Sequence, residues 1–413
     1  MAGPPVRDAD PRPGGEGLAL PVTLAVAAGL PLVAVFFVDA YRLPMMLLAV
    51  LSLPAAAMLA LRRGFEAPRS LVLLGMALFV VGTLMSTVVS QPMKPGQFAT
   101  LLGRGALAIW FMYLLALIAR RERAVLMPFL LALVVACGVS AAINAGLFLA
   151  GDPRALGDQE MRLVPVVGVA RHQWPTTISA TYAIMLAAAF ALAAAPDAKR
   201  WVRAAAGLSG VATALALALT QTRSGYLAAL AGIIAVAGFL SRRVLVATLA
   251  AIVVAAAVVL LYPPALDAIL ARGGSYRVAT WLRYLAFAAE NPLVGTGLTR
   301  RLWLAVEGVE VHHAHNMLIS ALVRGGLIGL AGMALMLFGG LYQAWRHAAQ
   351  SGHAAIFGMM AALAVASVFD YDLVLTPTDW MWLTFWMPVG LAAGAELAAR
   401  RGASGETATT PRT

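Results

Sequence analysis

Arg223 interrupts apolar sequence in this 413-residue chain, in the run Thr222-Arg223-Ser224-Gly225. Apolar segments precede and follow it with almost no loop between them. A guanidinium at such a boundary is costly unless it reaches the interface or meets a fixed anion. Its planar fork suits phosphate oxygens and its charge does not titrate, so Arg223 is a candidate phosphate ligand. The alternative is an arginine that contacts lipid headgroups.

A second polar group is the run Glu310-Val-His312-His313-Ala-His315-Asn316, where a long connection meets the next apolar stretch. A neutral imidazole that titrates near neutral pH suits a general base. Metal binding is the alternative, but zinc needs three or four converging ligands and no His-x-x-x-His pair is present. The asparagine could orient an imidazole or cap the following helix, and its position favours the cap.

The elements that must hold these residues are apolar. The composition is 61% hydrophobic and 12% charged, whereas soluble domains are about 25% charged. The single cysteine, Cys137, lies in an apolar run, which excludes a disulfide framework and a cysteine zinc site. We predict an all-α polytopic membrane protein with about twelve transmembrane helices. The predicted spans are 18–38, 43–61, 70–90, 99–119, 125–150, 173–195, 203–220, 224–240, 244–262, 316–342, 353–371 and 379–399.

Basic residues in the short connections predict the orientation, because cytoplasmic loops carry an excess of Lys and Arg. One alternating set of connections holds twelve cations and the other set holds three. Both termini are therefore predicted to be cytoplasmic. The corresponding regions are a cytoplasmic tail at 1–17, transmembrane helices 1–9 at 18–262, a large periplasmic loop with short helices at 263–315, transmembrane helices 10–12 at 316–399 and a cytoplasmic tail at 400–413.

Two long connections, 151–172 and 263–315, concentrate arginines on the predicted outer face. The same connections carry acidic residues, so some of these arginines are expected to be paired. We take Arg171 and Arg277 as candidate phosphate ligands beside Arg223. Four more are expected to be rim or lipid contacts: Arg162, Arg272, Arg300 and Arg301.

Three further polar positions could belong to a binding site or form ion pairs within the protein. Arg104 lies near the outer start of the fourth span, and Arg324 lies inside the tenth, where Asp370 or Asp372 is a candidate partner. Asp370-Tyr-Asp372, with Asp379 nearby, is an alternative site for a divalent ion or a carboxylate base. We favour pairing of these carboxylates with Arg324 at the helix end, or a polar plug, over a metal site.

The long outer connection also contains a helical pattern. Val278, Trp281, Leu282 and Leu285 are spaced i, i+3, i+4 and i+7, which predicts one apolar face of a short helix. We expect this face to pack on the bundle, and a gate for lipid substrates is the alternative. Gly326 and Gly329 are expected to allow close helix packing in the tenth span.

Several of these runs, taken in order over about 160–345, resemble the bacterial O-antigen ligase family. His315-Asn316 followed by Gly326-Leu-Ile-Gly329 is similar to the family's histidine motif. Ser275-Tyr-Arg277, then Trp281, then the run from Glu290 to Leu298 is similar to its large periplasmic loop. The Thr222-Arg223-Ser224-Gly225 step also matches. The sequence departs from the family's pattern in having three crowded histidines.

The resemblance implies a membrane glycosyltransferase of the GT-C type. Such an enzyme transfers O-antigen glycan from undecaprenyl diphosphate to the lipid A–core oligosaccharide, with inversion and without a metal or other cofactor. The reaction takes place at the periplasmic face of the bacterial inner membrane. The implied partners are these two substrates and membrane lipids, with no nucleic acid and no obligate protein partner.

The resemblance also implies roles for individual residues. His315 is the expected general base, and Arg223, Arg171 and Arg277 are expected to bind the diphosphate. Fixed guanidinium groups there would stabilise the charge that develops on a departing diphosphate. Further possible substrate contacts are His313, His312, Asn316 and Arg104.

Other functions remain open on the sequence. A polymerase that extends the carrier-linked glycan, or a protein O-oligosaccharyltransferase, would use similar chemistry. A polyprenyl-glycan transporter or flippase belongs to a different class and would also have about twelve spans. Transporters often have related halves with broken helices at the middle of the membrane. The polar residues here gather at one predicted face, which favours an enzyme at the interface.

Overall fold

The computed structural model describes residues 19–38, 42–61, 70–90, 95–120, 125–151, 162–168, 175–261, 276–300, 302–369, 375 and 379–404. In this part of the chain nine helices are long and apolar enough to cross a membrane, which confirms a polytopic helical protein. The first eight of them are α1 (Ala19–Phe37), α2 (Arg42–Leu61), α3 (Leu71–Ser90), α4 (Pro95–Ala119), α5 (Met127–Gly151), α6 (Pro175–Ala194), α7 (Arg200–Leu219) and α8 (Arg223–Leu240). The ninth is the longer stretch Met317–Ser351.

The remaining elements are α9 (Arg242–Leu261), α11 (Arg277–Glu290), β1 (Leu304–Val306), β2 (Val309–Val311), α14 (Ala355–Phe369), the π-helical turn η5 (Trp382–Trp386) and α15 (Met387–Ser404). Within Met317–Ser351, α12 (Met317–Ala334) continues through the π-helical turn η4 (Leu335–Gly339) into α13 (Gly340–Ser351). The predicted count of twelve spans and the positions of the termini remain predictions.

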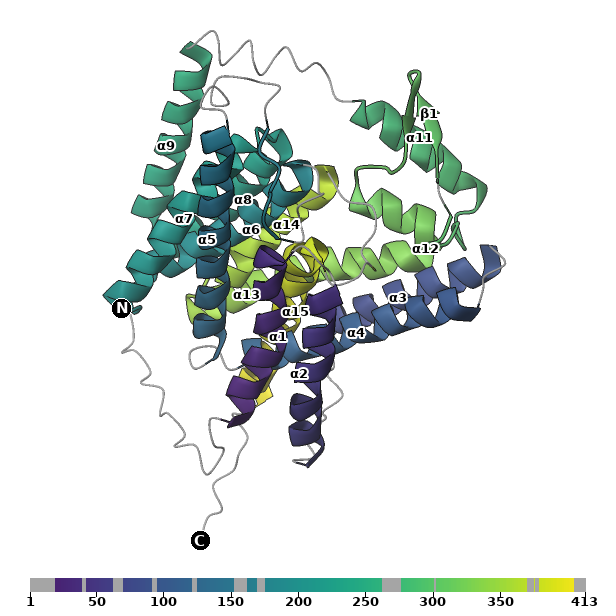
Figure 1. Cartoon of the computed structure of the whole chain (residues 1–413), viewed down its shortest axis with the longest axis horizontal. Helices are drawn as coiled ribbons and strands as arrows, with labels where there is room; N and C mark the ends of the chain where they lie inside the picture. Colours follow the sequence, from purple (N-terminus) through teal and green to yellow (C-terminus); the bar gives the residue numbers. More distant parts are fainter. Residues whose placement is uncertain are drawn as a thin grey trace.

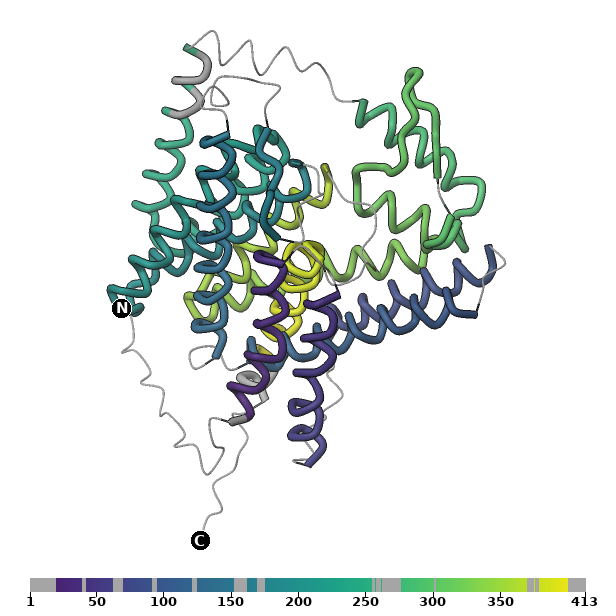
Figure 2. The backbone as a smooth tube through the Cα atoms, in the orientation of Figure 1, coloured from purple at the N-terminus to yellow at the C-terminus, as the bar shows by residue number. Residues whose placement is uncertain are grey.

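The helices form two groups around a shared core. In the first, α6 packs against α7, α8 and α14, and α5 packs against α7. In the second, α3 packs along α12 and touches α4, and these helices lean away from the others (Figure 1). The backbone tube shows α9 at the edge of the first group (Figure 2). Small residues permit close approach: a Cβ on Gly332 would lie 2.6 Å from the Gly75 carbonyl oxygen.

The predicted span 316–342 was wrong in one respect, because α12 is not a continuous helix. Gly326 has φ 61° and ψ −160°, so the chain turns sharply there. A Cβ on Gly329 would lie 3.0 Å from the Ala321 carbonyl oxygen, whereas residues eight apart in a straight helix are separated by about 12 Å. The segments before and after Gly326, which we call the first and second arms of α12, therefore fold against each other.

The break in α12 exposes backbone groups that a neighbouring loop satisfies. The Thr296 amide donates to the Val323 carbonyl over 2.8 Å, and the Leu327 amide donates to the Pro292 carbonyl over 2.9 Å. At the other side of this loop, the Ser90 hydroxyl donates to the Gly295 carbonyl over 3.0 Å. The loop 291–300 is thereby fixed between the end of α3 and the break in α12.

A small subdomain consists of α11, the β1–β2 hairpin and the first arm of α12. Its strands are antiparallel, with Leu304 opposite Val311. It has a core of its own, formed by Tyr284, Ala288, Leu302, Ala314 and Val323. The sequence predicted a short helix here, and α11 confirms it; the hairpin was not predicted.

The apolar face predicted for α11 differs from the face that the helix buries. Thr280, Tyr284 and Ala288 are buried, whereas Val278 and Leu282 are each 63% exposed. Packing of the whole predicted face on the bundle was therefore wrong. Trp281 is the exception, because its ring centroid lies 6.4 Å from that of Phe369 at the end of α14.

Candidate active site

The C-terminal end of α14 brings two of the predicted site regions together. The Asn316 side-chain amide donates to the Val368 carbonyl oxygen over 3.2 Å. The guanidinium carbon of Arg277 lies 5.7 Å from the centroid of the Phe369 ring, within the range of a cation–π interaction. The histidine run and the first residue of α11 therefore meet at two consecutive residues of α14.

His315 has an unusual backbone conformation, with φ 48°. Few non-glycine residues adopt positive φ, and such positions often occur at functional sites. Its amide donates to Nδ1 of His313 over 3.3 Å, and the two ring centroids are 3.8 Å apart. His312 points elsewhere, because its ring lies 3.7 Å from that of Trp303. The structure thus pairs two of the three histidines and separates the third.

Asn316 is the N-cap of α12. Its Oδ1 accepts from the amides of Leu318 and Ile319 over 3.0 and 3.1 Å. This geometry is that of a helix cap and confirms the role that the sequence favoured. Because the same side chain donates to α14, Asn316 also fixes the direction in which the chain leaves His315.

Arg223 is the first residue of α8, after a tight turn that joins α7 to α8. Gln221 has φ 50°, and Thr222 is the N-cap residue. Arg162 braces this turn: its Nε donates to the Thr220 carbonyl over 2.9 Å and its Nη2 to the Thr222 hydroxyl over 2.7 Å. Arg162, which we expected to be a rim or lipid contact, is half-buried and binds this turn of the protein. Arg223 itself is exposed.

The packing of α8 on α14 shows where Arg223 lies along the bundle. A Cβ on Gly358 would meet Val236, and a Cβ on Gly232 would meet Ala362. These two pairs define antiparallel helices, and the same register brings the start of α8 level with Phe369. Arg223 therefore lies at the same end of the bundle as Arg277 and His315.

Three helices begin at this end next to the candidate residues. They are α8 at Arg223, α11 at Arg277 and α12 at Met317, directly after Asn316, and none of them has an acidic residue in its first turn. Helix N-termini carry partial positive charge, so they attract anions, although Asn316 already caps two amides of α12. The sequence did not predict this convergence, because it depends on how the helices pack.

Arg324, on the first arm of α12, is 5% exposed. Its Nη1 donates to the carbonyl oxygens of Gly297 and Arg300 in the loop 291–300. The predicted carboxylate partners, Asp370 and Asp372, lie outside the described residues, and so does Arg171. Asp379 accepts from the Met381 amide over 2.9 Å, as a helix cap does.

The other candidate positions are less closely connected to this end. Arg104 lies within α4, which packs chiefly along α15. Among the residues that the structure describes, no group of three or more His, Cys, Asp or Glu side chains could hold a metal ion. Among the described residues, the predicted positions that the fold gathers at one end include Arg223, Arg277, His313, His315 and Asn316.

A comparison with protein families matches residues 208–334 to the family described as O-antigen ligase. The match covers less than a third of the chain and shows what this part is similar to. The matched region extends from α7 to the end of α12 and includes Arg223, Arg277 and the whole histidine run. Arg104 and Arg171 precede it. A search of curated proteins finds no match.

The match over residues 208–334 confirms the resemblance that the motifs indicated. It supports an enzyme of the ligase or polymerase type that acts on polysaccharide and lipid substrates. The apolar helices agree with a multi-pass membrane protein.

Proposed function

We propose that the chain is an O-antigen ligase of the GT-C type. It transfers O-antigen glycan from undecaprenyl diphosphate to the lipid A–core oligosaccharide at the periplasmic face of the inner membrane, with inversion and without a metal. The observation that carries this proposal is the meeting of His315–Asn316 and Arg277 at Val368 and Phe369. Arg223 lies at the same end of α8 and α14.

In the proposed reaction His315 removes the proton from an acceptor hydroxyl. The oxygen then attacks the anomeric carbon of the carrier-linked sugar, opposite to the bond that joins it to the diphosphate. That bond breaks, and its electron pair stays on the departing phosphate oxygen. A positioned base of this kind contributes about 10²–10⁴-fold to the rate.

Arg223 and Arg277 bind the diphosphate in this proposal, and Arg171 remains a third candidate. Guanidinium groups stabilise the departing charge more strongly in the transition state than in the ground state. The three helix N-termini at this end add to the positive potential. Together they supply the charge that a metal ion provides in metal-dependent glycosyl transfer.

The test is reconstitution of the purified protein with carrier-linked glycan and rough lipopolysaccharide. We expect a ladder of glycan on the lipopolysaccharide without added nucleotide, and the ladder should persist in chelator. His315→Ala should abolish it. His312→Ala is the matched control, because His312 packs on Trp303, and it should retain most of the product. Extension of the carrier-linked glycan alone would identify a polymerase instead, and full activity of His315→Ala would reassign the base.

A further inference from the structure

The turn between α7 and α8 needs support from elsewhere in the protein. Gln221 lies in it with φ 50°, and a non-glycine residue with positive φ persists only where the surrounding structure holds it. The support comes from the segment 162–168, which is neither helix nor strand. The Leu163 amide donates to the Leu219 carbonyl over 2.9 Å, beside the two hydrogen bonds from Arg162 to the turn. The conformation of the turn therefore depends on where this segment lies.

Asn144, on α5, binds the backbone of the segment 162–168. Its Oδ1 accepts from the amides of Val166 and Val167 over 2.7 and 3.0 Å. Its Nδ2 donates to the Val167 carbonyl over 3.3 Å. The side chain is 2% exposed. Because residues 162–168 belong to no sheet, one buried side-chain amide supplies hydrogen bonds that a neighbouring strand would otherwise supply.

Asn144 is in turn fixed by α5 and α1. Its Nδ2 also donates to the Ser140 carbonyl over 2.9 Å, and the Ser140 hydroxyl donates to the Phe36 carbonyl over 3.0 Å near the end of α1. Gly168 meets the same carbonyl, because a Cβ there would lie 2.7 Å from the Phe36 oxygen. The later part of the segment is therefore held between two helices.

These contacts form a continuous connection from α5 to the candidate active site. Asn144 holds the segment at Val166 and Val167. At the start of the segment Arg162 holds the turn, and Arg223 follows that turn as the first residue of α8. Without the Asn144 side chain two backbone amides would lose their acceptor, so the segment would shift to satisfy them elsewhere and would take Arg162 with it. A misplacement of about 1 Å in a group that binds substrate can cost about 10²-fold.

We propose that Asn144 is a positioning residue for Arg223. It touches no substrate itself; it fixes the segment 162–168, so that Arg162 holds the turn and Arg223 keeps the place from which it binds the carrier diphosphate. The inference rests on the proposed function, because it takes that diphosphate as the ligand of Arg223. Asn144 precedes the matched region 208–334, so the inference extends the site to a helix outside that region.

The test is kinetic and uses the reconstituted protein. Asn144→Leu keeps a similar branched shape and removes the hydrogen bonds to the segment. We expect it to raise the KM for carrier-linked glycan about ten-fold, because a displaced Arg223 binds the diphosphate less well. The KM for lipopolysaccharide should stay within about two-fold. A loss of folded protein alone would lower the rate and leave both KM values unchanged, and that result would overturn the proposal.

A second measurement asks whether Asn144 acts through Arg162. Arg162→Ala should raise the same KM, and the double variant should match Arg162→Ala to within about two-fold, because the connection is already broken. Effects that multiply in the double variant would show that Asn144 acts by another route and would contradict the proposal. Should Asn144→Leu not accumulate, Asn144→Ser takes its place, because the shorter side chain also leaves the two amides without their acceptor.

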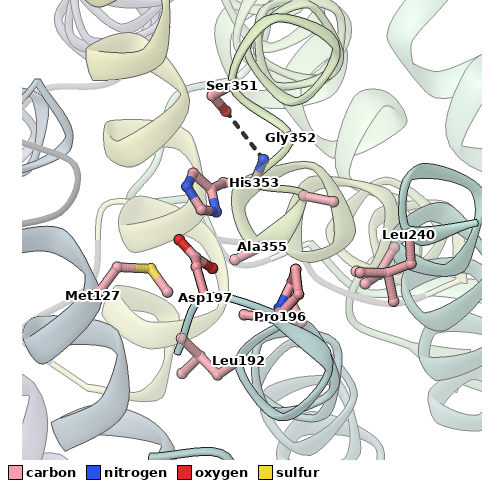
Figure 3. A pocket seen from close by; sticks show the side chains of 13 residues that line it. Met127, Leu192, Pro196, Asp197, Leu240, Ser351, Gly352, His353 and Ala355 are labelled. Atoms are coloured by element: carbon pink, nitrogen blue, oxygen red, sulfur yellow. Dashed lines mark hydrogen bonds between the residues drawn. The ribbon is translucent and has the colours of Figure 1, made fainter. Parts of the chain in front are cut away.

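Ser351→Ala is the matched control. The Ser351 hydroxyl also fixes a turn, since it accepts from the His353 amide over 3.1 Å (Figure 3). With Leu240, it borders a cavity of about 260 Å³. Leu240 is the last residue of α8, roughly 25 Å from the first at 1.5 Å per residue, so this turn lies far from Arg223. Ser351→Ala should leave both KM values unchanged. A change equal to that in Asn144→Leu would show a general effect and refute the positioning role.

Arg223→Ala separates this inference from the proposed function. Full transfer by Arg223→Ala would overturn the diphosphate role of Arg223, and the inference would fail with it. A raised KM for carrier-linked glycan in Arg223→Ala, with an unchanged KM in Asn144→Leu, would overturn the inference alone.

Discussion

His315 occupies a backbone position that disfavours its own side chain. Its φ of 48° lies in the left-handed region, where an L residue is strained and glycine is not. The ring contact with His313 and the cap at Asn316 hold it there. We therefore expect a residue without a Cβ to be less strained at this position.

This strain leads to a prediction for two substitutions at His315. His315→Ala and His315→Gly should both lose glycan transfer by about 10²–10⁴-fold, because both lack the base. They should differ in stability: the glycine variant should be more stable than the alanine variant by about 1 kcal/mol, since glycine adopts positive φ without strain. Thermal unfolding in detergent, with transfer measured in parallel, checks both parts. An alanine variant as stable as the glycine variant would contradict the strain.

A substitution at Arg277 tests whether the site needs only a positive charge or also the planar guanidinium group. Its guanidinium lies over Phe369, and lysine keeps the charge but loses the planar fork. We expect Arg277→Lys to reduce transfer at least ten-fold with little change in protein yield. Arg283→Lys is the matched control, because Arg283 is exposed on the same helix. Equal activity of the two variants would remove Arg277 from the site.

At the scale of elements, two irregular segments position the candidate residues. The turn between α7 and α8, braced by Arg162, presents Arg223. The break in α12 returns the first arm towards α14, where Asn316, the residue after His315, donates to the Val368 carbonyl. A continuous α12 would separate the imidazole from Arg277.

Gly326 should therefore be essential to the fold of α12. A Cβ there would lie 2.1 Å from the Leu293 carbonyl oxygen, and its φ of 61° with ψ −160° suits only glycine. We expect Gly326→Ala to lower the free energy of unfolding by several kcal/mol or to prevent accumulation. Gly339→Ala is the control, because a Cβ there meets nothing within 4 Å. Size-exclusion profiles of heated, detergent-solubilised protein measure the difference, and equal profiles would refute the break.

Glu396 is a buried carboxylate that the sequence analysis did not single out. Its oxygens accept from the Ser70 hydroxyl over 2.6 Å and from the Leu71 amide over 3.1 Å, so α15 caps the start of α3. Glu396→Ala should cost about 1–3 kcal/mol, because it leaves buried donors unsatisfied. Glu396→Gln keeps one acceptor oxygen and should cost less. Thermal unfolding ranks the variants, and a larger loss in the glutamine variant would contradict the cap.

At the scale of the whole molecule, hydropathy predicted where several spanning helices begin and end, because these positions depend on composition. The predicted span 43–61 is observed at Arg42–Leu61, and 70–90 at Leu71–Ser90. The break at Gly326 was missed because an apolar run does not reveal its φ, although the adjacent Gly325-Gly326 pair was a signal. The brace by Arg162 was missed because it depends on a contact across about 60 residues.

The site was predictable in its residue types but not in its arrangement. Motifs selected Arg223, Arg277 and His315, and none of those motifs shows that α14 joins them. The positions of the three helix N-termini follow from tertiary packing alone. The separation of His312 from His313 and His315 was not predicted either. It depends on the ring contact between His312 and Trp303, which precedes β1.

The predicted orientation can be tested with impermeant thiol reagents. The native Cys137 is buried and should not react. A cysteine in place of Glu307, at the turn of the β hairpin, should be labelled in intact cells with a permeable outer membrane. A cysteine in place of Ser241, between α8 and α9, should be labelled only after lysis. The reverse pattern would place the histidine run in the cytoplasm and contradict the proposed reaction.

A double-mutant cycle between Arg223 and Arg277 tests most directly whether the two guanidinium groups bind one diphosphate. Transfer rates of Arg223→Ala, Arg277→Ala and the double variant would be compared with that of the unchanged protein. Groups that act on the same leaving group should be coupled by at least about 1 kcal/mol, so the double variant should lose less than the product of the single losses. Losses that multiply to within about 0.5 kcal/mol would show that the two arginines act independently and would contradict the shared site.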